Sequence, residues 1–146
     1  NGYDFHSTAN ARIVGDYEAE VKVKVIEGIQ EGGFIFNLPS RFSKGSGQMV
    51  RFCGHEALWC GPFNSGGGFT LEHDIKTGLT TRDNSFHTLK IVVRNSKAVY
   101  DLFVDGKKVA ENLRITNVAP KEGAYIALVA CRGHVAFDDL KITPLK

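Results

Sequence analysis

The chain has 146 residues, of which 42% are hydrophobic and 23% are charged. This is the composition of a globular protein, and the length favours one domain, residues 1–146, with a single core. Eighteen Lys and Arg against sixteen Asp and Glu give a net charge of +2, and the charges are scattered. Capture of nucleic acid or of a membrane surface is therefore not expected. No apolar stretch approaches the ~20 residues that a membrane helix needs.

Short segments of alternating or β-branched residues, separated by turns rich in glycine, predict an all-β fold. The expected strands, in chain order, are 17–26, 33–38, 48–53, 69–74, 87–94, 98–104, 124–131 and 135–142. Residues 75–86 are polar and are expected to form a loop. Asp105 followed by Gly106 predicts a type I′ hairpin turn. The pattern indicates a two-sheet antiparallel β-sandwich.

Alternation also assigns faces to three of these strands. The side chains expected to point into the core are Phe34, Phe36, Leu38, Val50, Phe52, Phe69 and Leu71. Asn37, Arg51 and Glu72 are then expected together on the outer face. An arginine fork and a carboxylate form charge-assisted hydrogen bonds with neighbouring hydroxyls, so this set is a candidate sugar site. The alternative is an ordinary cross-strand ion pair between Arg51 and Glu72.

Trp59 is the sole tryptophan, and its ring offers a rigid apolar face on which a sugar could stack. If Leu58 points inward, alternation turns Trp59 outward; the alternative is a ring that plugs the edge of the sandwich beside Cys60. His55 and His73 lie in or near the same region. The sequence has no His-x-Glu-x-x-His or similar ligand spacing, so no cofactor is expected to be required.

The three cysteines, Cys53, Cys60 and Cys131, are too few for a disulfide scaffold and lack the paired spacing of a zinc site. In an oxidising compartment Cys53 and Cys60 could close a short loop by a disulfide. The alternative is three small buried thiols.

Asp138 and Asp139 form an acidic pair near the end of the last expected strand. Carboxylate oxygens in a bulge can join backbone carbonyls as ligands of a structural calcium ion. The alternative is that one of the two caps the turn from Gly133 and the other faces water.

Most of the chain resembles a known superfamily. Segments 87–93, 100–109, 123–128 and 135–142 are similar to the closing strands of a concanavalin A-like jelly roll, and 16–20 with 33–37 resemble its first strands. Within that superfamily the likeness is to levan-binding-type carbohydrate-binding modules and to 3-keto-disaccharide hydrolase domains. Segment 51–61 matches neither group, and the hydrolase group usually has an earlier strand with a Gly-Trp pair.

The resemblance implies a concanavalin A-like fold and a non-catalytic module that binds a plant or microbial glycan on its concave sheet. Because the chain begins with Asn1, we expect a processed product or a part of a larger multidomain protein, monomeric within it. A secreted or cell-surface bacterial enzyme that degrades polysaccharides is the expected parent. The alternatives are a hydrolase or lyase of the 3-keto-disaccharide type and a laminin-G-like adhesion domain that binds protein.

Overall fold

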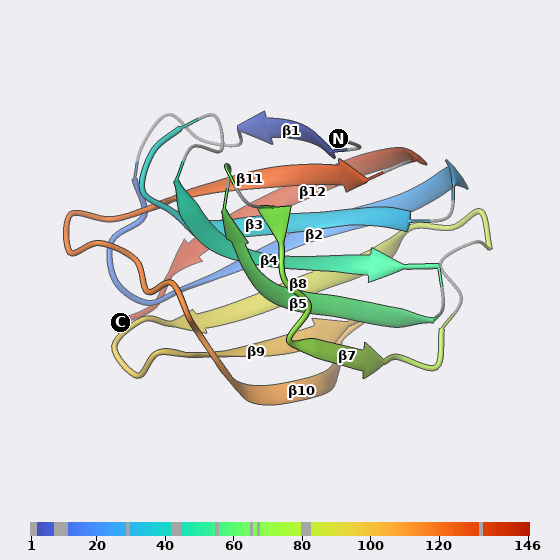
Figure 1. The fold of residues 1–146 in the computed structure, drawn as a ribbon. Helices are drawn as coiled ribbons and strands as arrows, with labels where there is room; N and C mark the ends of the chain where they lie inside the picture. Colours follow the sequence, from blue (N-terminus) through green and yellow to red (C-terminus); the bar gives the residue numbers. More distant parts are fainter. Residues whose placement is uncertain are drawn as a thin grey trace.

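Two antiparallel β-sheets make up the fold in the computed structural model (Figure 1). The structure describes residues 3–7, 12–28, 30–41, 45–54, 56–64, 66, 68–79, 83–131 and 133–146. Within these residues there are twelve strands and no helix. The strands are β1 (Tyr3–Ser7), β2 (Tyr17–Gly28), β3 (Gln30–Leu38), β4 (Ser46–Cys53), β5 (Ala57–Asn64), β6 (Gly68–Phe69), β7 (His73–Lys76), β8 (His87–Arg94), β9 (Val99–Val104), β10 (Lys107–Arg114), β11 (Tyr125–Cys131) and β12 (Gly133–Pro144). The predicted all-β class is confirmed.

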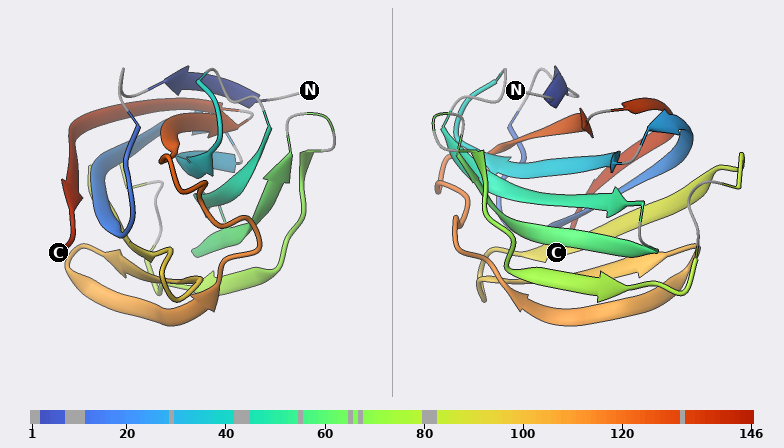
Figure 2. Two further views of the ribbon diagram at one scale, coloured as in Figure 1. Left: turned by 90° about the vertical axis from the view of Figure 1, so that its left-hand side faces the viewer. Right: turned by 45° about the vertical axis from the view of Figure 1, so that its right-hand side comes forward.

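The larger sheet has the strand order β1-β11-β3-β4-β5-β6, and β7 also pairs with β5. The smaller sheet has the order β10-β9-β8-β2-β12. Strands from the two ends of the chain therefore lie next to each other in both sheets, as β2 does beside β12. In the left view of Figure 2, β12 and β2 lie on one side of the molecule and β4 and β5 lie on the other. The predicted two-sheet sandwich is confirmed.

The main core lies between the sheets. In β2 the small and branched residues Ala19, Val21 and Val23 point inward and are at most 2% exposed, while the charged residues alternate with them on the outer face. They pack with inward side chains of β3, β4, β5, β8 and β9. The largest fully buried members of this core are Tyr17, Phe34, Phe36, Phe52, Leu58, Leu89, Ile91, Tyr100 and Leu102.

A second apolar cluster covers the outer face of the larger sheet. Its buried members are Ile35, Leu38, Met49, Phe63, Ala127 and Val129, with Phe69 and Tyr125 packed against them. Both faces of β3 and β4 are therefore largely apolar, unlike the outer face of a half-buried strand such as β2. The outer face of the larger sheet is the surface on which the site described below is built.

Leu38 and Leu71 do not point into the main core as predicted, because the backbone is irregular where they lie. Asn37 has a left-handed φ of 60°, and the pairing of β3 with β11 shifts between Tyr125 and Ala127. After this bulge Leu38 falls on the same side as Ile35 and joins the outer cluster. Leu71, expected in the core, lies between β6 and β7 and is 46% exposed.

Other local predictions are confirmed or corrected by the pairing. Asp105 and Gly106 have φ of 50° and 83°, the two positive values that a type I′ turn requires. The sequence did not predict β5, which contains Gly61 and Pro62. The expected strand 69–74 is instead divided into β6 and β7, with an irregular segment between them. No helix among the described residues is long and apolar enough to cross a membrane.

Candidate functional site

Arg51 forms the centre of the candidate site, on the outer face of the larger sheet. The alternation in β4 is as predicted, since Val50 and Phe52 belong to the main core while Met49 belongs to the outer cluster. The guanidinium carbon of Arg51 lies 5.2 Å from the ring centroid of Trp59 and 5.1 Å from that of Phe69. Arg51 is only 2% exposed. Arg51 is therefore a buried cation that contacts two aromatic rings.

The donor groups at this point lack partners. Nε and Nη1 of Arg51 and Nε1 of Trp59 are buried and have no hydrogen-bond partner in the described structure. Buried polar groups are nearly always hydrogen-bonded, and buried charges are nearly always paired. The site therefore contains several buried hydrogen-bond donors that the described protein groups leave unfilled.

Trp59 is positioned by its place in β5. Leu58 and Cys60 point into the main core, so Trp59 points outward, as the alternation predicted. It lies opposite Arg51 on β4 and opposite Asp74 on β7. Trp59 is half-buried, and β5 has a paired strand on each side of it, β4 and β7.

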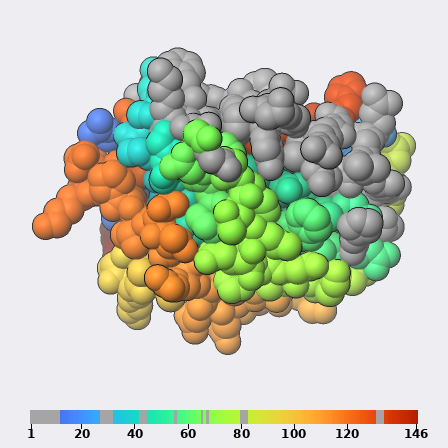
Figure 3. Space-filling model, viewed as in Figure 1, coloured from blue at the N-terminus to red at the C-terminus, as the bar shows by residue number. Residues whose placement is uncertain are grey.

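Phe69 reaches the site because the chain after β5 folds back along that strand. The Thr70 amide donates to the Pro62 carbonyl at 3.0 Å, so the lack of an amide proton on Pro62 does not interrupt this contact. A Cβ on Gly61 would lie 1.9 Å from the Thr70 carbonyl oxygen, so only glycine permits this approach. Figure 3 shows residues of β5 to β7, coloured green to yellow-green, across the middle of this face.

The sequence did not identify Phe69 as a site residue, because alternation placed it in the core. The glycine-rich stretch before it was the available signal, since such a stretch next to a strand indicates close backbone approach. Phe69 is half-buried and pairs in register with Phe63 of β5.

Glu72 does not join Arg51. Its side chain is exposed and accepts a hydrogen bond from the Thr116 hydroxyl at 3.3 Å, and no ion pair links it to Arg51 in the described structure. The predicted convergence is thus wrong for Glu72, because its backbone amide donates to the Cys60 carbonyl at 2.9 Å in the irregular segment between β6 and β7. His73 begins β7 opposite Cys60 and is partly buried. His55 lies outside the described residues.

Asn37 is a structural residue, 1% exposed, and the expectation that it faces outward is wrong. Its Oδ1 accepts from the Tyr17 hydroxyl at 3.0 Å. Its Nδ2 donates to Asn95 Oδ1 at 2.8 Å and to the Asn117 carbonyl at 3.1 Å. The left-handed backbone turns the side chain into this network, which ties β2 and β3 to the turn after β8 and to the loop after β10.

Cys53 and Cys60 do not form the predicted disulfide with each other. In the register of β4 and β5, Cys60 lies opposite Val50 while Cys53 lies opposite Ala57. Cys60 points into the main core, whereas Cys53 is an odd number of positions away along the ladder and projects from the other face. A disulfide needs Cα atoms within about 7 Å, which this separation does not permit. The side chain of Cys131 lies outside the description.

Asp138 and Asp139 lie in a bulge of β12, where the pairing with β2 shifts. Asp139 forms an ion pair with Lys22 at 2.8 Å, and its pKa is lowered by that contact. Asp138 Oδ1 accepts from the Asp139 amide at 2.8 Å. A lysine ammonium thus takes the place beside Asp139 that a calcium ion would need. No cluster of three or more metal-ligating side chains occurs among the described residues.

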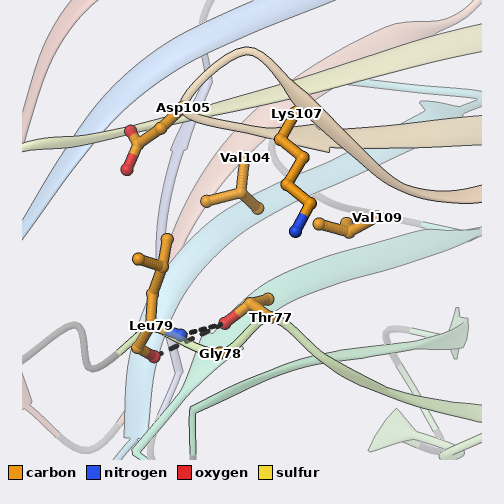
Figure 4. A pocket seen from close by; sticks show the side chains of 7 residues that line it. All are labelled: Thr77, Gly78, Leu79, Val104, Asp105, Lys107 and Val109. Carbon is orange, nitrogen blue, oxygen red and sulfur yellow. Dashed lines mark hydrogen bonds between the residues drawn. The ribbon is translucent and has the colours of Figure 1, made fainter.

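A separate pocket of about 380 Å³ lies between residues 77–79 and the hairpin of β9 and β10 (Figure 4). Its lining residues are Thr77, Gly78, Leu79, Val104, Asp105, Lys107 and Val109. The Leu79 amide donates to the Thr77 hydroxyl at 3.2 Å, which fixes this short loop. The pocket is on a different part of the molecule from Arg51.

His87 links the start of β8 to Asp105 of the same hairpin and to Asp83. Its Nδ1 lies 2.8 Å from Asp105 Oδ2 and its Nε2 lies 2.9 Å from Asp83 Oδ2. Burial lowers the pKa of His87, but the hydrogen bonds and charges of Asp105 and Asp83 outweigh burial and raise the pKa above its usual 6.5. Both Asp105 oxygens are occupied, because Oδ1 accepts from the Thr88 amide at 2.8 Å. The cluster therefore has a structural role: it holds the turn between β9 and β10 against the start of β8.

No family model and no curated protein sequence matches this chain, but solved structures do. The carbohydrate-binding module CBM66 from Bacillus subtilis matches with a TM-score of 0.79 and 14% identity, over 98% of this chain and 83% of that one. Sheep galectin-11 in complex with glycerol matches with a TM-score of 0.59 and 13% identity, over 97% and 98%. Domain 4 of AbnA, an extracellular arabinanase from Geobacillus stearothermophilus solved with arabinotriose, matches with a TM-score of 0.56 and 15% identity. That match covers 89% of this chain and 61% of the other.

These matches define the class of fold. The chain is a concanavalin A-like β-sandwich, and the predicted fold resemblance is confirmed. Among the matches named here it is most similar to the carbohydrate-binding module, with which it shares nearly its full length. At such low identity the similarity concerns the fold, and function has to be argued from the site.

Proposed function

We propose that this domain is a non-catalytic carbohydrate-binding module that holds a glycan on the outer face of its larger sheet. The observation that carries the proposal is the contact of Arg51 with the half-buried rings of Trp59 and Phe69, together with donors on Arg51 and Trp59 that have no partner in the described structure. The fold supports it, because the similar structures include a carbohydrate-binding module and a galectin.

Each residue has a distinct role in the proposed site. The half-buried rings of Trp59 and Phe69 supply apolar surface for the face of a sugar ring. Arg51 and the Trp59 indole donate hydrogen bonds to sugar oxygens, which satisfies donors that the protein itself leaves unpaired. His73 pairs with Cys60, whose side chain points into the main core, so His73 lies on the opposite face from Trp59 and we assign it no contact with the sugar.

The biological setting follows from the same proposal. A module of this kind brings a polysaccharide-degrading enzyme to its substrate, so we place the domain in a secreted or cell-surface bacterial protein. We propose that it acts as a monomer within a longer multidomain chain and needs no cofactor to bind.

Binding is tested by titration calorimetry of the purified domain against a panel of plant and microbial polysaccharides. A shallow sheet face with few hydrogen bonds predicts a dissociation constant in the micromolar to millimolar range, about −4 to −8 kcal/mol. Trp59→Ala is expected to weaken binding by about tenfold or more, equal to about 1.4 kcal/mol. Absence of binding to every glycan would refute the proposal, and release of reducing sugar would favour the hydrolase alternative.

The opposite sheet supplies a matched control. Phe103 on β9 is a partly buried aromatic ring with the Lys90 ammonium 4.8 Å from its centroid, so it also combines a ring and a cation. Phe103→Ala is expected to leave glycan affinity unchanged. An equal loss in Trp59→Ala and Phe103→Ala would show that the effect is on stability rather than on the site.

A further inference from the structure

We propose that the glycan recognised at this site is acidic, and that a sugar carboxylate pairs with Arg51. This inference rests on the proposed function, since it names the class of sugar bound on the outer face of the larger sheet.

The charge of Arg51 is not balanced by the described side chains. Its neighbours on the same face are Trp59 and Phe69, and its partner in register on β3 is Gly33. Asp74, the carboxylate that the register of β7 places on the same face, is two strands away from Arg51, about 10 Å at ~4.8 Å per strand. Asp74 already forms an ion pair with Lys76 at 3.3 Å.

Arg94 shows the usual arrangement in the same protein. Its side chain is 35% exposed, and it still has a carboxylate partner, because its Nη1 lies 2.7 Å from Asp101 Oδ2. Arg51 is far more buried, at 2% exposed, and has no such partner in the described structure. A buried cation gains most from a counter-charge because the surrounding medium screens it least. The missing anion is therefore best supplied by a ligand.

The hydrogen-bonding groups also favour a carboxylate over a hydroxyl. Guanidinium and indole nitrogens only donate, and the ring of Phe69 offers neither donor nor acceptor. A sugar hydroxyl both donates and accepts, so its proton would lack a partner here. An ionised carboxylate only accepts, and it matches the planar fork of an arginine. The donors of Arg51 and Trp59 are thus complementary to the carboxylate of an acidic sugar, a uronate.

The test compares an acidic polymer with its neutral ester and with an unrelated neutral polymer. Polygalacturonate, its fully methyl-esterified form and a neutral fructan are each titrated into the domain. The acidic polymer is expected to bind at least about tenfold more tightly than its ester. Because salt screens a buried ion pair much less than an exposed one, most of this advantage is expected to remain when the salt concentration is raised.

Variants link the preference to Arg51. Arg51→Gln is expected to abolish the preference for the acid over the ester, while Arg94→Gln keeps it. If Arg51→Gln fails to fold, Trp59→Phe, which retains a ring but removes the indole donor, is expected to reduce the preference. Preference retained in folded Arg51→Gln would overturn the inference.

The outcomes separate this inference from the function on which it rests. Equal binding of acid and ester, or binding of the neutral fructan alone, refutes the acidic ligand and leaves the carbohydrate-binding proposal in place. Binding of none of these polymers, nor of any other glycan, refutes both. Tight binding of sulfated but not carboxylated polymers refutes the carboxylate.

Discussion

Replacement of Asn37 by alanine tests how far the polar network between the sheets stabilises the fold. The change removes the acceptor of the buried Tyr17 hydroxyl and both donors that reach Asn95 and the Asn117 carbonyl. Two lost hydrogen bonds and one stranded buried hydroxyl together cost about 3 kcal/mol. Alanine must also adopt the left-handed φ of 60° at this position, which costs a further ~1–2 kcal/mol.

The two contributions are separated by a second variant. Asn37→Gly loses the same hydrogen bonds but accepts the left-handed backbone without strain. Its greater freedom in the unfolded chain offsets part of that advantage, so Asn37→Gly is expected to be more stable than Asn37→Ala by about 1 kcal/mol. Tyr17→Phe removes the hydroxyl together with its need for a partner, and its expected loss is about 1 kcal/mol.

Free energies of unfolding are measured by urea denaturation, followed by circular dichroism and by the fluorescence of Trp59. The expected order of stability is wild type, Tyr17→Phe, Asn37→Gly and Asn37→Ala. If Asn37→Ala unfolds with a loss below about 1 kcal/mol, the network contributes less than the contacts imply. If Asn37→Gly is no more stable than Asn37→Ala, the left-handed conformation is not a source of strain.

Three further predictions concern titration, thiol chemistry and metal. The raised folded pKa of His87 means that its stabilising contribution is full below pH 6.5 and is lost as the pH rises through the folded value. The lowered pKa of Asp83 means that its stabilising contribution is present above pH 3.8 and is lost as the pH falls through the folded value. Free energies of unfolding measured across pH should fall at both ends of the range, and His87→Gln should remove the fall on the alkaline side. Burial raises the pKa of Cys60 to about 12, so alkylation of the native protein at neutral pH should spare it, and peptide mapping without reductant should find no bond between Cys53 and Cys60. Added calcium or a chelator should leave the melting temperature unchanged, because a lysine already pairs with Asp139. A melting temperature that rises with calcium would instead support a metal site at Asp138 and Asp139.

The sequence alone determined the class of fold. Period-two alternation of apolar and charged residues, as in 18–25, predicts a half-buried strand because successive side chains point to opposite faces. Asp105 and Gly106 predicted their own turn, since few other residues accept two positive φ angles in succession. These signals are local, and each can be interpreted from a few neighbouring residues.

Alternation failed where the backbone departs from a regular strand. Leu38 lies on the outer face and not in the core, because the backbone of Asn37 before it is left-handed. Glu72 does not lie beside Arg51, because its backbone pairs with β5 in an irregular segment. A one-residue irregularity reverses every later side chain of a strand. The sequence did not reveal these points, because the bulge depends on partners distant along the chain.

The candidate site was decided by tertiary structure. The sequence correctly turned Trp59 and Arg51 outward, but both were expected to face solvent on a polar surface. Instead β5, which the sequence did not predict, places Trp59 beside Arg51, and the return of the chain over Gly61 brings the ring of Phe69 within 5.1 Å of the guanidinium carbon of Arg51. A buried cation that has no hydrogen-bond partner among the described residues arises from the packing of three segments, and no single segment of the sequence contains that information.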